Sequence, residues 1–227
     1  EIEDIIPPPT EKIIVIDPGH GGSASGAIWP IGSSNPDFKE KDLTLKIANT
    51  LKELLESNGY NVIMTRNKDE DIPFSKRAQI ANEVHADYFV SIHMNANSDK
   101  RISGGEIYIP CTRKSTSDCY NVPGANTYIC DKSYCKEYES TNSDHRRFTN
   151  SLDFANKMIK FFNEDGFLHL SNPNIRGLGV TVLQETKMPA ILIEVGFISN
   201  ENDRKIASFQ PEKYAQAIAD GIDKSVA

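Results

Sequence analysis

The sequence predicts one α/β domain in which short apolar strands alternate with amphipathic helices. Its 227 residues, of which 38% are hydrophobic, are enough for one sizeable core and few for two. Runs of β-branched residues that stop at glycine or proline indicate strands buried on both faces, which is typical of parallel sheets. Leucine, isoleucine and alanine recur at helical spacing between these runs, which indicates helices packed on the sheet.

The first expected strand covers residues 12–17 (KIIVID) and leads into the motif DPGHGG at 17–22. His20 therefore follows the carboxyl end of a strand, the edge at which open α/β sheets bind ligands. The glycines of the motif permit a sharp turn and leave room beside the imidazole. A lone histidine is usually a packed core residue, but this setting favours a ligand site.

The next expected element is a helix over Glu40–Ser57, with leucines and isoleucines on one face and Gly59 as its stop. Glu40 lies in the first turn. A carboxylate there is favoured by the helix dipole, so Glu40 has a structural interpretation beside a functional one.

Two more polar residues end apolar strands in the rest of the chain. The pattern predicts strands at 60–65, 87–93, 105–109, 180–183 and 190–194, and helices at 73–83, 151–164 and 211–226. The strand over 87–93 ends on His93, and Asn95 in the following loop would line the same cleft. Glu194 closes the apolar strand over 190–194, which is costly unless the carboxylate is paired or active.

Four motifs in this order resemble a known family. They are DPGHGG at 17–22, EKD at 40–42, SIHMNA at 91–96 and EVGFISN at 194–200. Together they resemble the type-3 family of zinc-dependent N-acetylmuramoyl-L-alanine amidases, over roughly residues 12 to 224.

The resemblance implies a fold and a reaction. The fold is a mixed, mostly parallel sheet of about six strands flanked by helices. The reaction is hydrolysis of peptidoglycan at the amide bond between N-acetylmuramic acid and L-alanine, by water that zinc activates.

The resemblance also implies that His20, Glu40 and His93 bind Zn²⁺ and that Glu194 is the catalytic carboxylate. Three such ligands leave a fourth position for water, whose pKa falls to about 7 on zinc. Glu194 would then take the proton from that water and pass it to the released amine.

Asn95 and Arg176 are further candidates for substrate binding. Arg77 is expected to pair with a carboxylate at the sheet edge. For both arginines, surface charge or ordinary packing is the alternative interpretation.

A polar segment at about 110–150 holds all four cysteines: Cys111, Cys119, Cys130 and Cys135. An even number of clustered cysteines favours two disulfides in an oxidising compartment, although a zinc knuckle or free thiols are alternatives. The segment is longer than the connection that minimal relatives need. We expect it to lie beside or over the zinc cleft, where it would restrict access or shape peptide recognition.

Composition and the chain start bear on partners and location. The net charge of −7 and the pI near 5.3 provide no basic stripe, which argues against nucleic acid as a partner. No run approaches the roughly 20 apolar residues of a membrane span. Residues 1–11, with three consecutive prolines, read as a linker or tail left after removal of a signal or anchor segment, ahead of a catalytic domain at 12–227. These features favour an extracytoplasmic protein of the periplasm, the cell wall or the exterior; a regulatory protein partner would remain unknown.

Two other functions compete with the amidase. One is a catalytically silent or autoinhibited regulator that binds peptidoglycan with the same fold. Such a protein would be expected to lose a ligand or the catalytic glutamate, and all four residues are present. The other is a zinc peptidase that acts on protein, which would share the site and differ in the groove.

Overall fold

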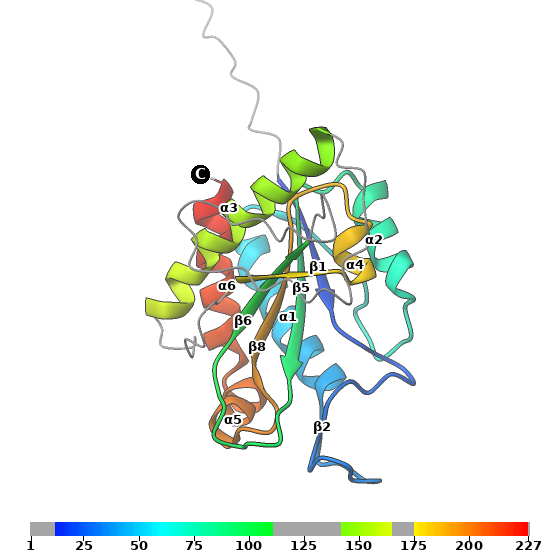
Figure 1. The fold of residues 1–227 in the computed structure, drawn as a ribbon, viewed down its shortest axis with the longest axis vertical. Helices are drawn as coiled ribbons and strands as arrows, with labels where there is room; N and C mark the ends of the chain where they lie inside the picture. Colours follow the sequence, from blue (N-terminus) through cyan, green and yellow to red (C-terminus); the bar gives the residue numbers. More distant parts are fainter. Residues whose placement is uncertain (1–11, 111–141, 165–174, 227) are drawn as a thin grey trace, which may run out of the picture.

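The computed structural model describes residues 12–110, 142–164 and 175–226, which contain a central six-stranded sheet (Figure 1). The strands follow the order β4-β1-β5-β8-β6-β7, with bounds Asn61–Met64, Ile13–Pro18, Tyr88–Asn95, Ala190–Phe197, Glu106–Pro110 and Ile175–Leu178. The first four are parallel, β6 is antiparallel to β8, and β7 is parallel to β6. The expected mixed, mostly parallel sheet of six strands is confirmed.

Helices cover both faces of the sheet. On one face lie α1 (Glu40–Ser57), α3 (Asn142–Glu164), α5 (Glu201–Phe209) and α6 (Pro211–Val226); on the other lie α2 (Phe74–Glu83) and the single turn α4 (Thr181–Gln184). A two-stranded ribbon, β2 (Ile28–Trp29) with β3 (Phe38–Lys39), stands apart from the main sheet. None of the helices in the described ranges is both long and apolar enough to cross a membrane.

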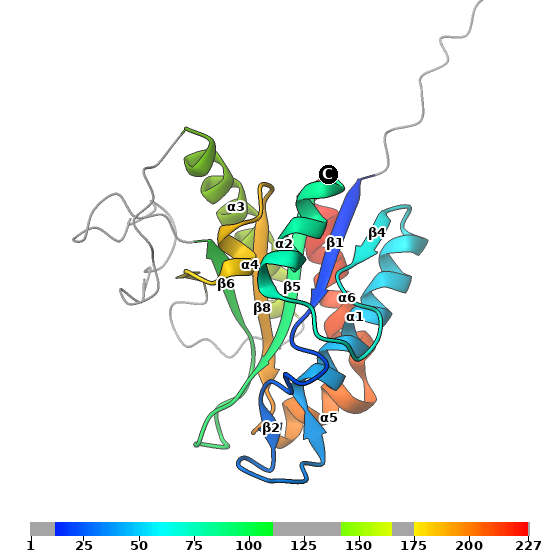
Figure 2. The same ribbon diagram turned by 90° about the vertical axis from the view of Figure 1, so that its right-hand side faces the viewer.

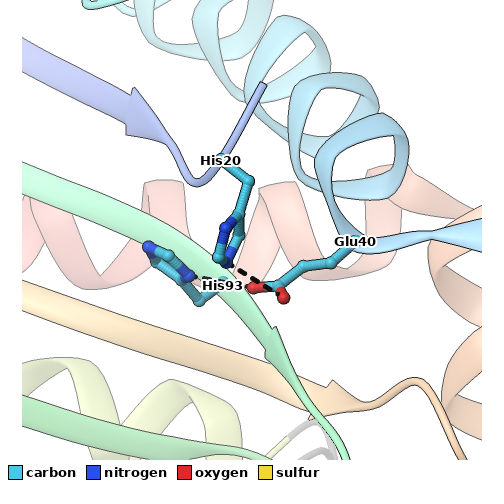
Figure 3. A group of neighbouring side chains, drawn as sticks. All are labelled: His20, Glu40 and His93. Carbon is cyan, nitrogen blue, oxygen red and sulfur yellow. Dashed lines mark hydrogen bonds and ion pairs between the residues drawn. The ribbon is translucent and has the colours of Figure 1, made fainter. Parts of the chain in front are cut away.

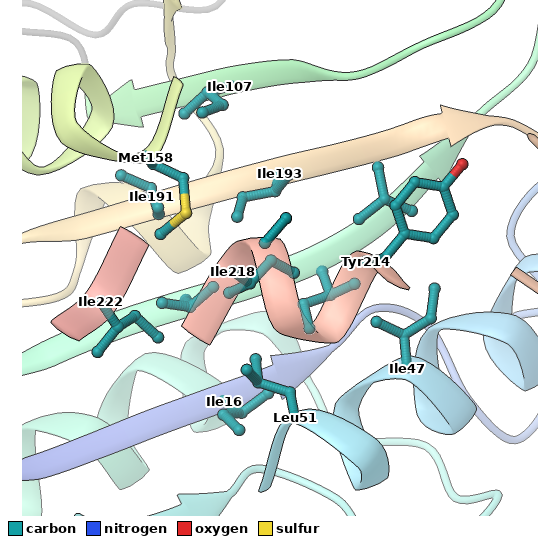
Figure 4. Close-up of a cluster of buried hydrophobic side chains, with 14 of the residues drawn as sticks. Ile16, Ile47, Leu51, Ile107, Met158, Ile191, Ile193, Tyr214, Ile218 and Ile222 are labelled. Carbon is teal, nitrogen blue, oxygen red and sulfur yellow. The ribbon is translucent and has the colours of Figure 1, made fainter. Parts of the chain in front are cut away.

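The larger core lies between the sheet and the helix layer of α1, α3 and α6 (Figure 4). Leu51 of α1 and Ile218 of α6 are fully buried there against strand residues such as Ile16 and Ile193. Burial of one such side chain stabilises the fold by about 1.5–3 kcal/mol. This core anchors the helix that carries Glu40 at its first residue.

The smaller core lies on the opposite face, under α2 and α4. Val15, Phe89 and Leu192 of β1, β5 and β8 contribute to it, all from the amino-terminal halves of their strands. Figure 2 shows α2 and α4 toward the upper end of the sheet, with β5 and β8 continuing below them. Because side chains alternate between faces, the residues that continue this face toward the carboxyl ends of β5 and β8 are His93, Asn95 and Glu194.

The structure corrects one strand and adds elements that the pattern did not indicate. Residues 180–183 do not form a strand: Val180 is extended, and α4 begins at Thr181. The sixth strand is instead Ile175–Leu178, whose arginine and glycine interrupt the apolar pattern. Short apolar runs fit either a strand or a buried helical turn, and packing of Val182 and Leu183 in the smaller core decided for the helix.

The helices expected at 40–57 and 211–226 are confirmed, and that at 73–83 begins one residue later. The helix expected from Ser151 begins at Asn142. The linker prediction for residues 1–11 and the disulfide prediction for Cys111, Cys119, Cys130 and Cys135 lie outside the described residues.

Candidate metal centre and active site

His20, Glu40 and His93 meet at the carboxyl ends of β1 and β5 (Figure 3). His20 follows β1, Glu40 opens α1, and His93 lies in β5. Each offers one ligand atom, and these atoms all lie within 4.8 Å of one another. The three residues that the sequence singled out as metal ligands are therefore neighbours in space.

Glu40 is buried, and both of its oxygens are satisfied. Oε2 accepts a hydrogen bond from the Ala27 N–H at 2.7 Å and lies 3.1 Å from His20 Nε2. Oε1 accepts one from the Met94 N–H at 3.0 Å and lies 2.9 Å from His93 Nδ1. Burial raises the pKa of Glu40, but the hydrogen bonds with the two imidazoles outweigh it, so the net pKa falls below the ordinary value.

Two buried arginines hold the turn that carries His20. Arg66 donates to the carbonyls of Pro18 and Gly19 at 2.9 and 2.8 Å. Arg77 donates to the carbonyls of Pro18 and His20, both at 2.7 Å. His20 has a φ of 59°, which is uncommon for a residue other than glycine, and these bonds fix the backbone in that conformation.

Arg77 also forms the ion pair that was expected of it, with Asp17 at 2.8 Å. Both side chains are buried, and Asp17 accepts further hydrogen bonds from the hydroxyls of Thr65 and Ser91. A buried pair with its remaining donors and acceptors satisfied is rigid. Sequence reasoning missed Arg66, which follows β4 and has no local signal of its own.

Two glycines leave the space that the metal-binding residues occupy. A Cβ on Gly19 would lie 2.4 Å from the His93 ring. A Cβ on Gly26 would lie 2.4 Å from Glu40 Oε2, and Gly26 also has a φ of +67°. The room that the glycines of DPGHGG were expected to leave is used in part by His93 itself.

Glu194 lies in β8 directly beside His93 of β5 and opposite Glu106 of β6 in the sheet register. Its Oε2 is enclosed and has no hydrogen-bond partner among the described residues. Burial, followed by the negative charges of Glu40 and Glu106, raises the pKa of Glu194 well above its ordinary value. A carboxylate whose pKa is raised in this way binds a proton more readily than an ordinary glutamate does, as a general base must.

Glu106 is the site residue that sequence reasoning missed. It is buried and held by Arg176 at 3.2 Å, by the Tyr108 hydroxyl at 2.9 Å and by the Asn95 amide at 3.2 Å. The predicted substrate-binding residues Asn95 and Arg176 thus meet around this carboxylate. The sequence did contain a signal for it, because Glu106 opens an apolar strand, just as Glu194 was expected to close one; β8 in fact continues past Glu194 to Phe197.

Two cavities adjoin the site. A cleft of about 740 Å³ is lined by polar residues that include Asn95, Arg101, Glu106 and Arg176. A cavity of about 260 Å³ contains His20 and His93 and is walled mainly by apolar residues of α2, α4 and β8. The smaller cavity thus reaches the two histidines, and the cleft reaches Glu106.

The residues present fit a zinc ion. Two imidazole nitrogens and one carboxylate oxygen are donors that Zn²⁺ prefers, and three protein ligands are typical of catalytic rather than structural zinc. The backbone N–H groups of Ala27 and Met94 orient the Glu40 carboxylate toward both histidines, as the groups around a metal ligand commonly do. A divalent metal site at His20, Glu40 and His93 is what this donor set supports.

Comparison with known proteins agrees with this chemistry. The family model described as N-acetylmuramoyl-L-alanine amidase matches residues 14–224. The amidase AmiC of Escherichia coli O6:H1 is 34% identical over 223 residues, which are 92% of this chain and 52% of AmiC. The probable cell wall amidase LytH of Staphylococcus aureus is 31% identical over 215 residues, 93% of this chain and 57% of LytH. The chain thus spans about half the length of these relatives.

Solved structures show the same fold. The catalytic domain of the amidase CwlV from Bacillus (Paenibacillus) polymyxa var. colistinus has a TM-score of 0.69 at 27% identity, covering 95% of this chain and 98% of CwlV. The amidase CwlD of Clostridioides difficile, solved in complex with the GerS lipoprotein, has a TM-score of 0.71 at 25% identity, covering 95% and 98%. With a family model that matches nearly its whole length, the chain belongs to the N-acetylmuramoyl-L-alanine amidase family.

Proposed function

We propose that this chain is a zinc-dependent amidase that cleaves peptidoglycan between N-acetylmuramic acid and the L-alanine of the stem peptide. One observation carries the proposal: His20, Glu40 and His93 bring their ligand atoms within 4.8 Å, and Glu194 lies beside His93 in the sheet. Membership of the amidase family supports the substrate.

The metal-binding role falls to His20, Glu40 and His93. When bound there, a zinc ion would lower the pKa of water to about 7 and polarise the carbonyl of the amide. Gly26 and the Ala27 N–H keep Glu40 turned toward His20, and Arg77 fixes the turn from which His20 projects.

Glu194 would act as general base and then as general acid. It would accept a proton from the water that attacks the carbonyl carbon. It would donate that proton to the L-alanine nitrogen as the C–N bond breaks, leaving a carboxylate on the muramoyl side and an amine on the peptide. Its raised pKa favours the first step, because a carboxylate with a higher pKa is a stronger base and holds the accepted proton until the amine leaves.

Asn95 and Arg176 would contact the substrate beyond the scissile bond. Both line the polar cleft and both bind Glu106. The two residues are thereby held in fixed positions without help from the substrate.

The enzyme is expected to act outside the cytoplasm, in the periplasm, the cell wall or the exterior. The relative LytH of Staphylococcus aureus, named a probable cell wall amidase, supports this location. Two disulfides among Cys111, Cys119, Cys130 and Cys135 would suit such a compartment. Mass spectrometry of the alkylated protein before and after reduction would count them.

The deciding experiment is digestion of purified peptidoglycan by the wild type and by Glu194→Gln, with bound zinc measured in each. Release of intact stem peptides by the wild type, together with a zinc-loaded but inactive variant, supports the amidase. A wild type that binds zinc and releases nothing contradicts it and favours the silent or autoinhibited regulator. Deletion of residues 111–141 would separate the two forms of regulator, because relief of autoinhibition restores activity.

A further inference from the structure

The two cavities at the site meet different parts of the same two strands. His93 of β5 and Leu192 of β8 line the apolar cavity, whereas Asn95 and Phe197, farther along β5 and β8, line the polar cleft. The two cavities have no lining residue in common, and Glu194 lies between Leu192 and Phe197 on β8. A substrate whose amide is cleaved at Glu194 has one substituent to place in each cavity.

The polar cleft is built for a charged group. Arg176 is 28% exposed, and its ion-pair partner among the described residues is the buried Glu106. That pair engages one terminal nitrogen of the guanidinium, Nη2, so donors remain beyond it on the exposed part of the side chain. A planar fork held at one end in this way is suited to a carboxylate.

The other cavity is suited to an uncharged group. Val180, Val182 and Leu192 contribute to its wall, and the two charged residues that also line it, Asp17 and Arg77, are buried and paired with each other. Phe74 stands at the start of α2 with 59% of its surface exposed and also lines the cavity. An exposed aromatic ring beside apolar side chains provides a flat surface on which the C–H face of a sugar ring packs.

The chemistry of the substrate decides which group goes where. The carboxyl group of muramic acid is consumed in the scissile amide, so the muramoyl side is uncharged at this point. The stem peptide keeps at least one free carboxylate. We propose that the stem peptide occupies the polar cleft, with a carboxylate on Arg176, and that the muramoyl sugar occupies the cavity at Phe74. This orientation rests on the proposed amidase function.

The first test compares two muramoyl dipeptides that differ only in the carboxylate of the second residue, free in one and amidated in the other. Wild type should prefer the free acid in kcat/KM by about tenfold or more, as expected for a hydrogen bond between charged groups. Arg176→Gln should reduce that preference to near unity, and Arg176→Lys should keep part of it. Arg146→Gln, an exposed arginine on α3, is the matched control that keeps the wild-type ratio.

The second test replaces the muramoyl group by a bare lactoyl group on the same peptide. Phe74→Ala should lower kcat/KM for the muramoyl substrate about fivefold, the scale of one aromatic contact, and leave the lactoyl substrate unchanged. Phe209→Ala is the matched control, since Phe209 on α5 is also an exposed phenylalanine, at 73%, and does not line the cavity.

The outcomes separate the two proposals. If zinc-loaded wild type cleaves none of the substrates, the amidase function itself fails. If it cleaves them but Phe74→Ala alters the carboxylate preference and Arg176→Gln alters the sugar dependence, the substrate lies in the reverse direction. If each variant lowers every rate by the same factor, neither cavity has the specific role assigned to it.

Discussion

The two halves of the site are stabilised in different ways. In the proposed metal-binding half (His20, Glu40 and His93), both oxygens of Glu40 have backbone and imidazole partners, and arginines hold the backbone around His20. In the substrate half (Glu194 and Arg176), a buried oxygen and a buried nitrogen have no partner among the described residues. Both oxygens of Glu40 are thus satisfied by described residues, whereas Glu194 and Arg176 each keep one enclosed polar atom that no described residue satisfies.

The sharpest test of this contrast is Glu194→Gln. The amide keeps the shape of the side chain but cannot carry the proton, so kcat should fall by about 10²- to 10⁴-fold. Zinc content should stay at the wild-type level, because Glu194 is outside the ligand set. Measurement of turnover and of bound zinc on the same samples checks both. Loss of zinc from the variant would show that the two halves are not separable.

Arg77→Ala should mainly lower the free energy of unfolding, since it removes support from the metal-binding half. It leaves the buried Asp17 without its cation and frees the carbonyl of His20. Breaking such a pair costs about 3–5 kcal/mol of unfolding free energy, measurable by urea denaturation. Arg77→Lys keeps the positive charge but not the planar guanidinium, so it should recover part of the lost unfolding free energy. A stability within 0.5 kcal/mol of wild type, roughly the value for neutral surface changes, would contradict the bracing role.

Gly26→Ala should weaken zinc binding more than it weakens the fold. The new Cβ would clash with Glu40 Oε2, and the alanine would have to adopt a positive φ, which costs about 1–3 kcal/mol. Competition with a chelator measures the zinc affinity. Gly32→Ala is the matched control, since Gly32 also has a positive φ of 77° but no atom lies within 4 Å of the added Cβ. Equal zinc affinities in the two variants would rule out a specific clash at Glu40.

The smallest effect expected is a pH dependence of the metal-free protein. The pKa of Glu194 is raised by burial above its ordinary 4.5, so the folded state binds its proton more tightly than the unfolded state does. The stabilisation that comes from this tighter proton binding is present below about pH 4.5 and is lost as the pH rises through the pKa of Glu194 in the folded state. Glu194→Gln should therefore be stabilising relative to wild type at pH 8 and close to neutral at pH 4.

Urea denaturation of chelator-treated wild type and Glu194→Gln at the two pH values checks this. Glu40 acts in the other direction, since its lowered pKa gives stability that disappears as the pH falls below about 4.5. It is present in both proteins, so the difference between them reports Glu194 together with its interaction with Glu40. A difference that is larger at pH 4 than at pH 8 would contradict the assignment.

Local sequence pattern determined much of the fold and of the metal-binding half. The helix that begins at Glu40, and the strands that bring His20 and His93 to one sheet edge, follow from apolar periodicity and from glycine and proline stops. The pattern failed at residues 175–183, where a run of four or five residues fits either a strand or a turn of helix. There the packing of Val182 and Leu183 in the smaller core favoured the helical turn.

Only the tertiary structure decided which residues support the site. Arg66 and Arg77 reach carbonyls 47 to 59 residues away, and Glu106 meets Glu194 because β6 runs antiparallel to β8. Periodicity reports the side of a helix or strand on which a residue lies, and therefore finds the ligands at strand ends. It does not report strand order or direction, and these determine which carboxylate, arginine or cavity stands beside those ligands.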